Sequence, residues 1–297
     1  MSSRPCWLLY GNVYQTKKNK YVSHILHTIS RLGVQVYVEE TFARFIEDKL
    51  GISTSHCPTF NSNDTLPQAD AAISVGGDGT FLTTAARVGQ RGIPILGINT
   101  GHLGFLADVS PQHIESSLTM LLEGEYVIEE RSALQVMVDQ CPFEIRPYGL
   151  NEVAVLKHDN SSLIEVETYI NHKLLTTYSA DGLIVCTPTG STGYSLSVGG
   201  PILMPTTSTF CLSPVAPHSL SVRPVVVGDD VIIDLNIHTR SHRFLLSVDG
   251  VSQSLPETST ITVKRAERPI KAIKIQHTDF WATLREKMMW GADIRNL

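Results

Sequence analysis

The chain has 297 residues, enough for one large domain or two of ordinary size. Its 42% hydrophobic and 18% charged residues are typical of a packed globular protein, and a formal net charge of −5 argues against a general nucleic-acid binder. The five scattered cysteines have neither zinc-site nor redox spacing, and no signal peptide or apolar run of ~18 residues is present, so we expect a soluble, reduced, cytoplasmic protein that binds no membrane.

Short apolar strands alternate with helices over the first 125 residues, which is typical of a parallel α/β sheet. The pattern predicts strands at 7–10, 34–38, 70–75 and 93–98, with helices at 22–32, 41–50, 81–88 and 111–122. Two loops, one holding Asp78 and one at 101–105, follow the carboxyl ends of strands. Open α/β sheets bind their ligands at this edge.

From about residue 126 the pattern changes to short, β-branched, often alternating stretches without convincing helices, which predicts an all-β domain. Its expected strands lie at 134–138, 153–156, 163–170, 183–185, 231–235 and 244–248. The chain then ends in a strand-like segment at 270–275 and an amphipathic helix at 279–290. We expect this tail to fold back onto the first domain, which gives the divisions 1–125, 126–269 and 270–297.

The segment Gly76-Gly77-Asp78-Gly79-Thr80 is the most informative motif in the chain. It joins a buried-looking strand to an alanine-rich helix, and glycines at such a junction let backbone N–H groups approach a phosphate closely. A carboxylate repels phosphate, so Asp78 fits better opposite a hydroxyl that attacks one. The alternative is a tight Asp-Gly hairpin turn, but helical spacing at 81–88 argues against it. The turn therefore predicts phosphoryl transfer.

The densest polar stretch runs from 179 to 182 and again from 187 to 197. Its hydroxyls, glycines and Tyr194 supply small donors, close backbone approach and a ring for a planar base, whereas a surface loop with a helix cap explains the same composition. Asn151-Glu152 offers donors and acceptors suited to a base edge or to ribose hydroxyls, but exposed pairs of this kind are common. By themselves, these two features leave a nucleotide site and a surface loop equally open.

Together the motifs resemble the NAD kinase family. Four hallmarks occur in the family's order: Gly76 to Thr80, Asn151-Glu152, Asp181-Gly182, and Thr187 to Tyr194. Segments 97–106, 199–201, 247–250 and 287–295 are also similar to the family, so the resemblance covers nearly the whole chain after the first strand. The glycine-rich turn alone is shared with diacylglycerol and sphingosine kinases, whereas the combination is specific.

The resemblance implies an α/β N-terminal (Rossmann-like) domain and an all-β C-terminal domain with the active site between them. It implies transfer of the γ-phosphate of ATP, or of polyphosphate in some members, to the 2′-hydroxyl of the adenosine ribose of NAD. A divalent metal, usually Mg²⁺, would be carried with ATP, and no residue of the chain is assigned as a metal ligand. The family also commonly forms homodimers or homotetramers through the β domain.

By the same resemblance, Asp78 is the catalytic residue that takes or orients the proton of the attacking hydroxyl. An aspartate at a helix N-terminus has a low pKa, so we expect it to act mainly as a hydrogen-bond acceptor. Gly77, Gly79 and Thr80 would present the turn's backbone to the NAD diphosphate. The NAD pocket would also contain Phe105 beside the adenine, Asn151 and Glu152 on adenine and ribose, Asp181 at the nicotinamide end, and Thr189, Thr192, Gly193, Tyr194, Ser195, Leu196 and Ser197.

Some residues and functions stay open. Asp249 suits a ligand contact or a strand-ending turn equally well, Arg223 fits a fold-supporting role better than a phosphate contact, and Ser179-Ala180 stands where many relatives carry a basic residue. Two other functions compete with NAD phosphorylation: a lipid kinase that shares the turn, and a non-catalytic NAD sensor. The intact Asp78 and the intact loop at 187–194 count against both.

Overall fold

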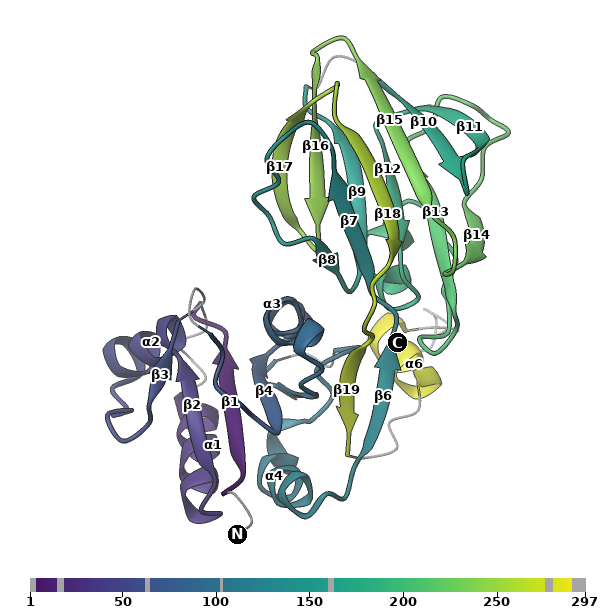
Figure 1. Cartoon of the computed structure of the whole chain (residues 1–297). Helices are drawn as coiled ribbons and strands as arrows, with labels where there is room; N and C mark the ends of the chain where they lie inside the picture. The colour runs from purple at the N-terminus through teal and green to yellow at the C-terminus, as the bar shows by residue number, and fades with distance from the viewer. Residues whose placement is uncertain are drawn as a thin grey trace. The chain divides into compact units, whose positions relative to one another are not determined.

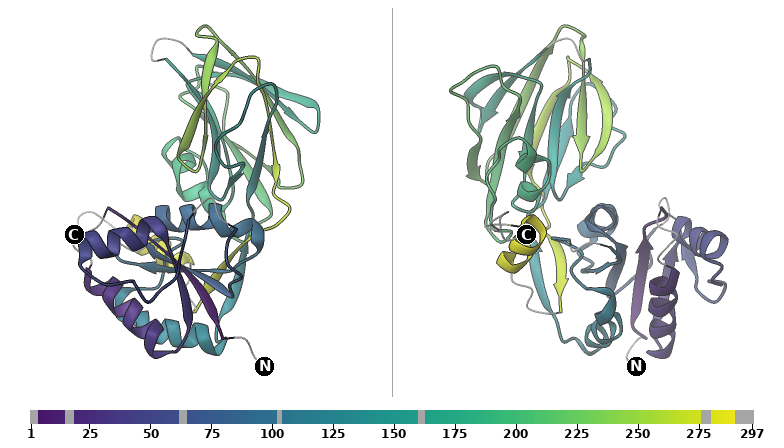
Figure 2. Two further views of the ribbon diagram at one scale, coloured as in Figure 1. Left: turned by 60° about the vertical axis from the view of Figure 1, so that its left-hand side comes forward. Right: turned by 180° about the vertical axis from the view of Figure 1, so that it is seen from behind.

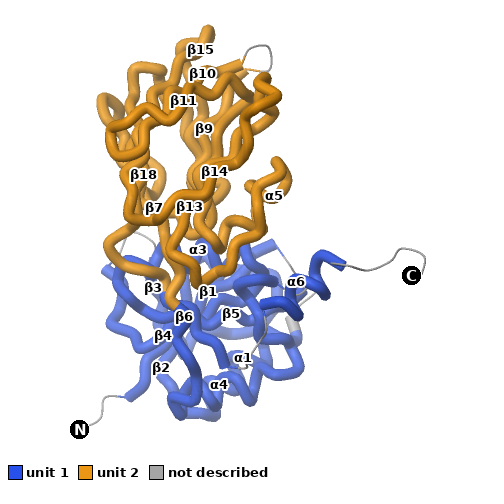
Figure 3. Tube along the Cα trace, turned by 90° about the vertical axis from the view of Figure 1, so that its right-hand side faces the viewer, with its two compact units in different colours: residues 1–129, 271–297 blue, residues 130–270 orange. Residues whose placement is uncertain are grey.

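The structure, a computed structural model, describes residues 4–14, 19–61, 65–101, 104–159, 163–275 and 280–289. The chain divides into two compact units, residues 1–129 with 271–297, and residues 130–270 (Figure 3). No helix within the described ranges is long and apolar enough to cross a membrane. Residues 102–103 of the predicted ligand loop and 290–297 of the family-like tail lie outside the described residues.

The first unit contains a seven-stranded sheet with the order β3-β2-β1-β4-β5-β19-β6 (Figure 1). The β1–β5 strands pair in parallel, and Ala272 of β19 pairs in parallel with Ile95 of β5. The tail therefore returns to the first sheet, as predicted. Its strands are β1 (Cys6–Gly11), β2 (Gln35–Glu39), β3 (Thr59–Phe60), β4 (Ala71–Gly76), β5 (Ile95–Asn99), β6 (Val127–Arg131) and β19 (Ile270–Lys274).

Helices cover both faces of this sheet (Figure 2). Strand side chains alternate between faces, so Leu96 and Ile98 of β5 join the core cluster of α1, α2 and α4, whereas Gly97 between them faces Phe81 of α3. The helices are α1 (Asn19–Arg31), α2 (Glu40–Leu50), α3 (Asp78–Val88), α4 (Ile114–Glu123) and α6 (Phe280–Met288), with 3-10 turns η2 (Gly89–Arg91) and η3 (Pro111–His113).

The glycine-rich turn ends β4 and begins α3. The helix starts at Asp78, three residues before the periodic apolar positions, with Gly77 as an extended N-cap residue (φ −112°, ψ −167°). The N–H groups of Thr80 and Phe81 donate to the Gly77 carbonyl at 3.0 and 3.1 Å. Asp78 and Gly79 therefore occupy the first turn, where backbone N–H groups have no partner within the helix.

The second unit contains two six-stranded antiparallel sheets, ordered β11-β10-β15-β18-β7-β8 and β14-β13-β12-β9-β16-β17. Val166 of the first sheet and Val155 of the second share one buried core, so the sheets pack face to face as a sandwich. The predicted all-β second half is confirmed. The strands are β7 (Leu134–Val138), β8 (Tyr148–Gly149), β9 (Glu152–Lys157), β10 (Ile164–Ile170), β11 (Lys173–Ala180), β12 (Gly182–Cys186), β13 (Thr209–Val215), β14 (Val225–Gly228), β15 (Ile233–Thr239), β16 (Arg243–Val248), β17 (Val251–Pro256) and β18 (Thr260–Arg265).

The segment after β12 packs on the outer face of the second sheet. It forms two short helical turns, η4 (Thr189–Thr192) and α5 (Tyr194–Ser197), in a domain where the sequence predicted no convincing helix. Ile184 and Cys186 of β12 are buried on this face against Val198 and Leu203. These apolar contacts hold the polar loop at the end of β12. Helices of four residues are too short to show a helical period in the sequence, so these two were not predicted.

Candidate active site

Asp78 is held by the backbone of the loop that follows β5. Its Oδ1 accepts hydrogen bonds from the N–H groups of Leu106 (2.9 Å) and Ala107 (3.1 Å), and its Oδ2 accepts one from Phe105 (2.9 Å). Gly104 permits this close approach, because a Cβ there would lie 2.1 Å from Asp78 Oδ1. The two predicted ligand loops of the first unit therefore meet at one fixed carboxylate.

Lys287 of α6 is the fourth donor to this carboxylate. Its Nζ donates to Asp78 Oδ2 at 2.9 Å and lies 4.4 Å from the centre of the Phe105 ring. Burial opposes the ionisation of Asp78, but the N–H groups of Leu106 and Phe105 and the Lys287 ammonium outweigh it and lower the pKa of Asp78. The carboxylate is thus ionised at neutral pH, and it is a good hydrogen-bond acceptor but a weak base.

A cavity of about 430 Å³ adjoins the glycine-rich turn. Gly77 and Gly79 face open space here, since a Cβ on either would have no atom within 4 Å. Backbone N–H groups at an open helix N-terminus suit a phosphate group. The cavity is lined by Tyr10, Gly11, Asn12, Val13, Tyr14, Glu39, Thr41, Gly77, Gly79, Thr80, Thr83, Thr84 and Arg87.

In the second unit, Asn151 and Glu152 stand at the start of β9 with unsatisfied polar atoms. Asn151 Oδ1 and Glu152 Oε2 are both buried and have no hydrogen-bond partner among the described residues. Gly193 lies against them, because a Cβ there would be 3.2 Å from Glu152 Oε2 and 3.5 Å from Asn151 Nδ2. Buried polar atoms without partners are rare in native folds, so these three residues form a candidate site for a polar ligand.

Asp249 fixes the turn that carries this pair. Its carboxylate accepts the N–H groups of Leu150 (2.7 Å), Asn151 (2.8 Å) and Glu152 (3.0 Å), and its own φ is +47°. Of the two roles that the sequence left open, these contacts support the turn. Burial, followed by the charge of Asp249, raises the pKa of Glu152 to about 7.

The polar loop docks on the same turn. The N–H of Thr187 donates to the carbonyl of Asn151 (2.9 Å), and Gly190 is so close that a Cβ would lie 2.1 Å from that oxygen. Thr189 is buried and accepts a hydrogen bond from the buried Arg131 at 3.2 Å. Arg131 was missed in the sequence, because no motif surrounds it and a buried cation has no pattern of its own.

One predicted residue of the loop, Ser195, is buried in the interior of the second unit instead. Ser195 is buried and its hydroxyl shares a hydrogen bond of 2.9 Å with that of Ser213 on β13. That hydroxyl therefore serves the packing of α5. The other predicted residues of this loop from Thr192 onward are at least partly accessible: Thr192, Gly193, Tyr194, Leu196 and Ser197.

Asp181 lies apart from the Asn151-Glu152 pair within this unit. Asp181 precedes β12 and Thr187 follows it, so the strand holds the two residues roughly 20 Å apart. The Asp181 carboxylate forms an ion pair with Lys157 at 2.7 Å. Arg223 donates to two carbonyls of its own loop at 2.7 Å, which agrees with a fold-supporting role.

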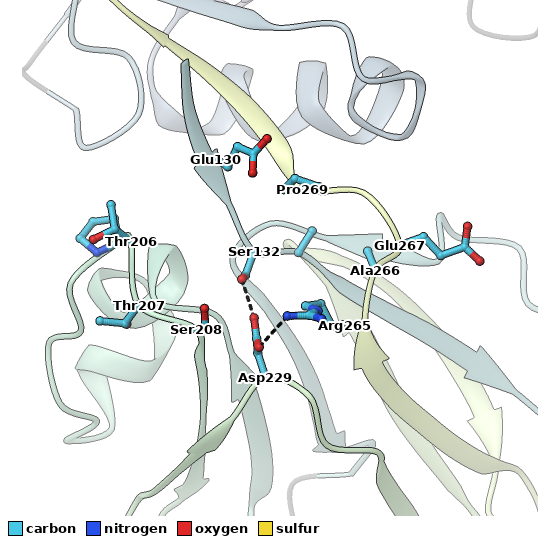
Figure 4. A pocket seen from close by; sticks show the side chains of 12 residues that line it. Glu130, Ser132, Thr206, Thr207, Ser208, Asp229, Arg265, Ala266, Glu267 and Pro269 are labelled. Atoms are coloured by element: carbon cyan, nitrogen blue, oxygen red, sulfur yellow. Dashed lines mark hydrogen bonds and ion pairs between the residues drawn. The ribbon is translucent and has the colours of Figure 1, made fainter. Parts of the chain in front are cut away.

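A second cavity, of about 410 Å³, lies in the second unit and is lined by none of the predicted site residues (Figure 4). Its buried Asp229 accepts hydrogen bonds from Ser132 (2.8 Å) and from the guanidinium of Arg265 (2.9 Å). Because these partners satisfy Asp229 within the fold, the unsatisfied Asn151-Glu152 turn is the stronger candidate for a ligand site in this unit.

Known families match both parts of the chain. Residues 8–126 match the family model described as ATP-NAD kinase N-terminal domain, and residues 150–275 match the ATP-NAD kinase C-terminal domain. The NAD kinase of Bacteroides fragilis (strain YCH46) is 49% identical over 287 residues, which cover 97% of this chain and 98% of that protein.

Solved structures agree with this assignment. An NAD kinase from Archaeoglobus fulgidus in complex with ATP is 27% identical, with a TM-score of 0.70 over 97% of both chains. Yeast NADH kinase complexed with NADH is 21% identical and shows the same fold, with a TM-score of 0.88 over 100% of this chain and 91% of that one. These relatives give no support to the lipid-kinase and sensor alternatives. The chain therefore belongs to the NAD kinase family of phosphotransferases.

Proposed function

We propose that the protein transfers the γ-phosphate of ATP to the 2′-hydroxyl of the adenosine ribose of NAD, with Asp78 as the acceptor of the hydroxyl proton. Membership of the NAD kinase family supports the reaction. The observation that carries the residue assignment is the ionised Asp78 carboxylate at the N-terminus of α3, held by three backbone N–H groups from residues 105–107.

The chemistry follows from the low pKa of Asp78. The hydroxyl oxygen forms a bond to the γ-phosphorus while the bond from phosphorus to the bridging oxygen of ADP breaks. Asp78 first orients the hydroxyl through a hydrogen bond and takes the proton late, when that group has become acidic. Such a group contributes ~10²–10⁴-fold to the rate, and positioning and charge neutralisation supply the rest. Gly79 and Thr80 are proposed to hold the NAD diphosphate at the open end of α3.

The Asn151-Glu152 turn is proposed to bind the adenosine part of NAD. Asn151 Oδ1 can accept a hydrogen bond from an amino group, and Glu152, with a pKa of about 7, can accept from or donate to a ribose hydroxyl. Gly193 has no side chain to crowd Glu152 Oε2 or the Asn151 amide beside it, where a Cβ would lie 3.2 Å from Oε2 and 3.5 Å from Nδ2. Phe105 as the adenine wall and Asp181 at the nicotinamide end stay predictions.

We expect a divalent metal, usually Mg²⁺, to arrive with the phosphates of the donor and to neutralise their charge. Among the described residues, no group of three or more His, Cys, Asp or Glu side chains is placed to hold a metal ion, so the chain itself offers no metal cage. Polyphosphate as an alternative donor and a homodimer or homotetramer also stay predictions.

A coupled assay tests the proposal. Purified protein is mixed with NAD, ATP and Mg²⁺, and the product is detected by a dehydrogenase that accepts only NADP. Asp78→Asn should lower turnover by roughly 10²–10⁴-fold while NAD still binds. Glu115→Gln is the matched control, since Glu115 is the acidic residue in the first turn of α4 and pairs with Arg31. Turnover by Asp78→Asn equal to that of the control would overturn the assignment.

A further inference from the structure

All acceptor positions of Asp78 are filled in the described structure. An ionised carboxylate offers about four lone-pair positions. Leu106 and Ala107 use the two on Oδ1, and Phe105 and Lys287 use the two on Oδ2. A substrate hydroxyl can therefore reach Asp78 only after one donor leaves. Three of the donors are backbone groups that cannot leave without moving the loop, so the side chain of Lys287 is the donor that exchanges.

Contact with the Phe105 ring holds the Lys287 ammonium near Asp78 after it gives up its hydrogen bond to that carboxylate. Its Nζ lies 4.4 Å from the centre of the Phe105 ring, within the range of a cation–π interaction. Leu284 of α6 is buried, and the Phe280 ring lies 6.1 Å from the Phe105 ring, centre to centre. The ammonium is thus tethered beside Asp78, although its flexible stem allows it a new partner.

Anchoring of the tail does not explain this ion pair. The side chains of Lys287 and Asp78 are 34% and 27% exposed, and ion pairs with this exposure contribute little to stability. The tail is already fixed by β19 in the sheet and by the more buried pair of Lys274 and Asp108 at 2.6 Å. Among the described residues, Lys287 is the charged side chain that lowers the pKa of Asp78.

We propose that Lys287 is a further catalytic residue: it yields its acceptor position on Asp78 to the attacking hydroxyl and then binds the phosphoryl group that is transferred. This inference rests on the proposed function of Asp78. The ammonium keeps its three protons throughout. The hydroxyl proton goes to Asp78, the new bond joins the hydroxyl oxygen to phosphorus, and the bond electrons of the old phosphorus–oxygen bond leave with ADP. Lys287 neutralises charge on the phosphoryl oxygens.

The test compares Lys287→Met, Lys287→Arg and Arg285→Met in the full chain. Arg285→Met is the matched control, because it removes a cation from the same helix. We measure kcat and KM for NAD and for ATP across pH, with thermal unfolding of each variant. Lys287→Met should lower kcat by roughly 10²–10³-fold with KM for NAD changed less than about threefold. Lys287→Arg should restore about tenfold or more of that loss, and Arg285→Met should stay within about twofold of the parent.

The pH profile separates catalysis from a structural role. Without the Lys287 charge the pKa of Asp78 rises, so the acidic limb of kcat/KM should move to higher pH in Lys287→Met. The proposal is overturned if Lys287→Met keeps kcat within threefold of the parent, or if its loss is not restored by arginine and the acidic limb does not move. A parent chain that does not phosphorylate NAD would instead overturn the proposed function and this inference with it.

Discussion

Asp249 and Glu152 exchange two hydrogen bonds, one donated by the backbone N–H of each residue. Asp249 Oδ1 accepts the N–H of Glu152 at 3.0 Å, and the N–H of Asp249 donates to the carbonyl of Glu152 at 3.1 Å. This exchange fixes the turn but also brings two buried carboxyl groups together, which contributes to the raised pKa of Glu152. The residue that fixes the backbone of Glu152 thus lies 97 positions later in the chain.

Asp249→Asn should weaken both the fold and NAD binding. One amide oxygen cannot accept all three N–H groups that the carboxylate accepts, and a buried donor left unsatisfied costs about 1–3 kcal/mol. Thermal unfolding and KM for NAD measure the two effects. Asp139→Asn, an exposed aspartate of the same unit, should leave both unchanged. If the two variants behave alike, Asp249 does not hold the turn.

Glu152 should make stability depend on pH. Its pKa is about 7 in the fold and 4.5 ordinarily, because burial and then Asp249 disfavour its charge. The contribution of protonated Glu152 to the free energy of unfolding is therefore fully present below pH 4.5 and is lost as pH rises through 7; this loss is at most about 3 kcal/mol. Unfolding at pH 5 and pH 7.5 should show a larger loss for the parent than for Glu152→Gln. Parallel losses would contradict the assigned pKa.

Gly104→Ala should impair turnover more than folding. Its Cβ would lie 2.1 Å from Asp78 Oδ1, so the carboxylate must move, and a displacement of ~1 Å at a reacting group costs about 10²-fold in rate. Gly228→Ala is the control, because a Cβ there meets the carboxylate of Asp230, 2.7 Å away, outside the predicted site. We expect kcat to fall in the first variant alone; an equal effect in both would point to general destabilisation.

Arg131→Met should raise KM for NAD several-fold and leave kcat nearly unchanged. The buried guanidinium donates to Thr189, so its loss releases η4 and costs about 1.5–3 kcal/mol of stability. Arg131→Lys should recover part of the KM change. Arg243→Met removes an exposed arginine that donates to Ser254, and its kinetics should match the parent. A fall in kcat without a change in KM would refute a role of Arg131 in the proposed NAD pocket.

The sequence by itself determined the order of elements and the position of the chemistry. Apolar periodicity and turn residues act over a few neighbouring positions, so the α/β pattern, the all-β half and the strand–turn–helix around Asp78 could be predicted locally. The motif order then indicated the family. The division placed at 125/126 differs from the observed end of the first unit at 129, because β6 joins the first sheet as an edge strand. Edge pairing has no local signal.

Only the tertiary structure decided which groups meet. Lys287 and Asp78 are 209 positions apart, and Arg131 and Thr189 are 58 apart, so no local pattern relates either pair. The inward turn of Ser195 likewise depends on its partner on β13. These contacts arise when strands distant in the chain take up their register and fix the loops between them, because hydrogen bonding and burial act between neighbours in space rather than in sequence.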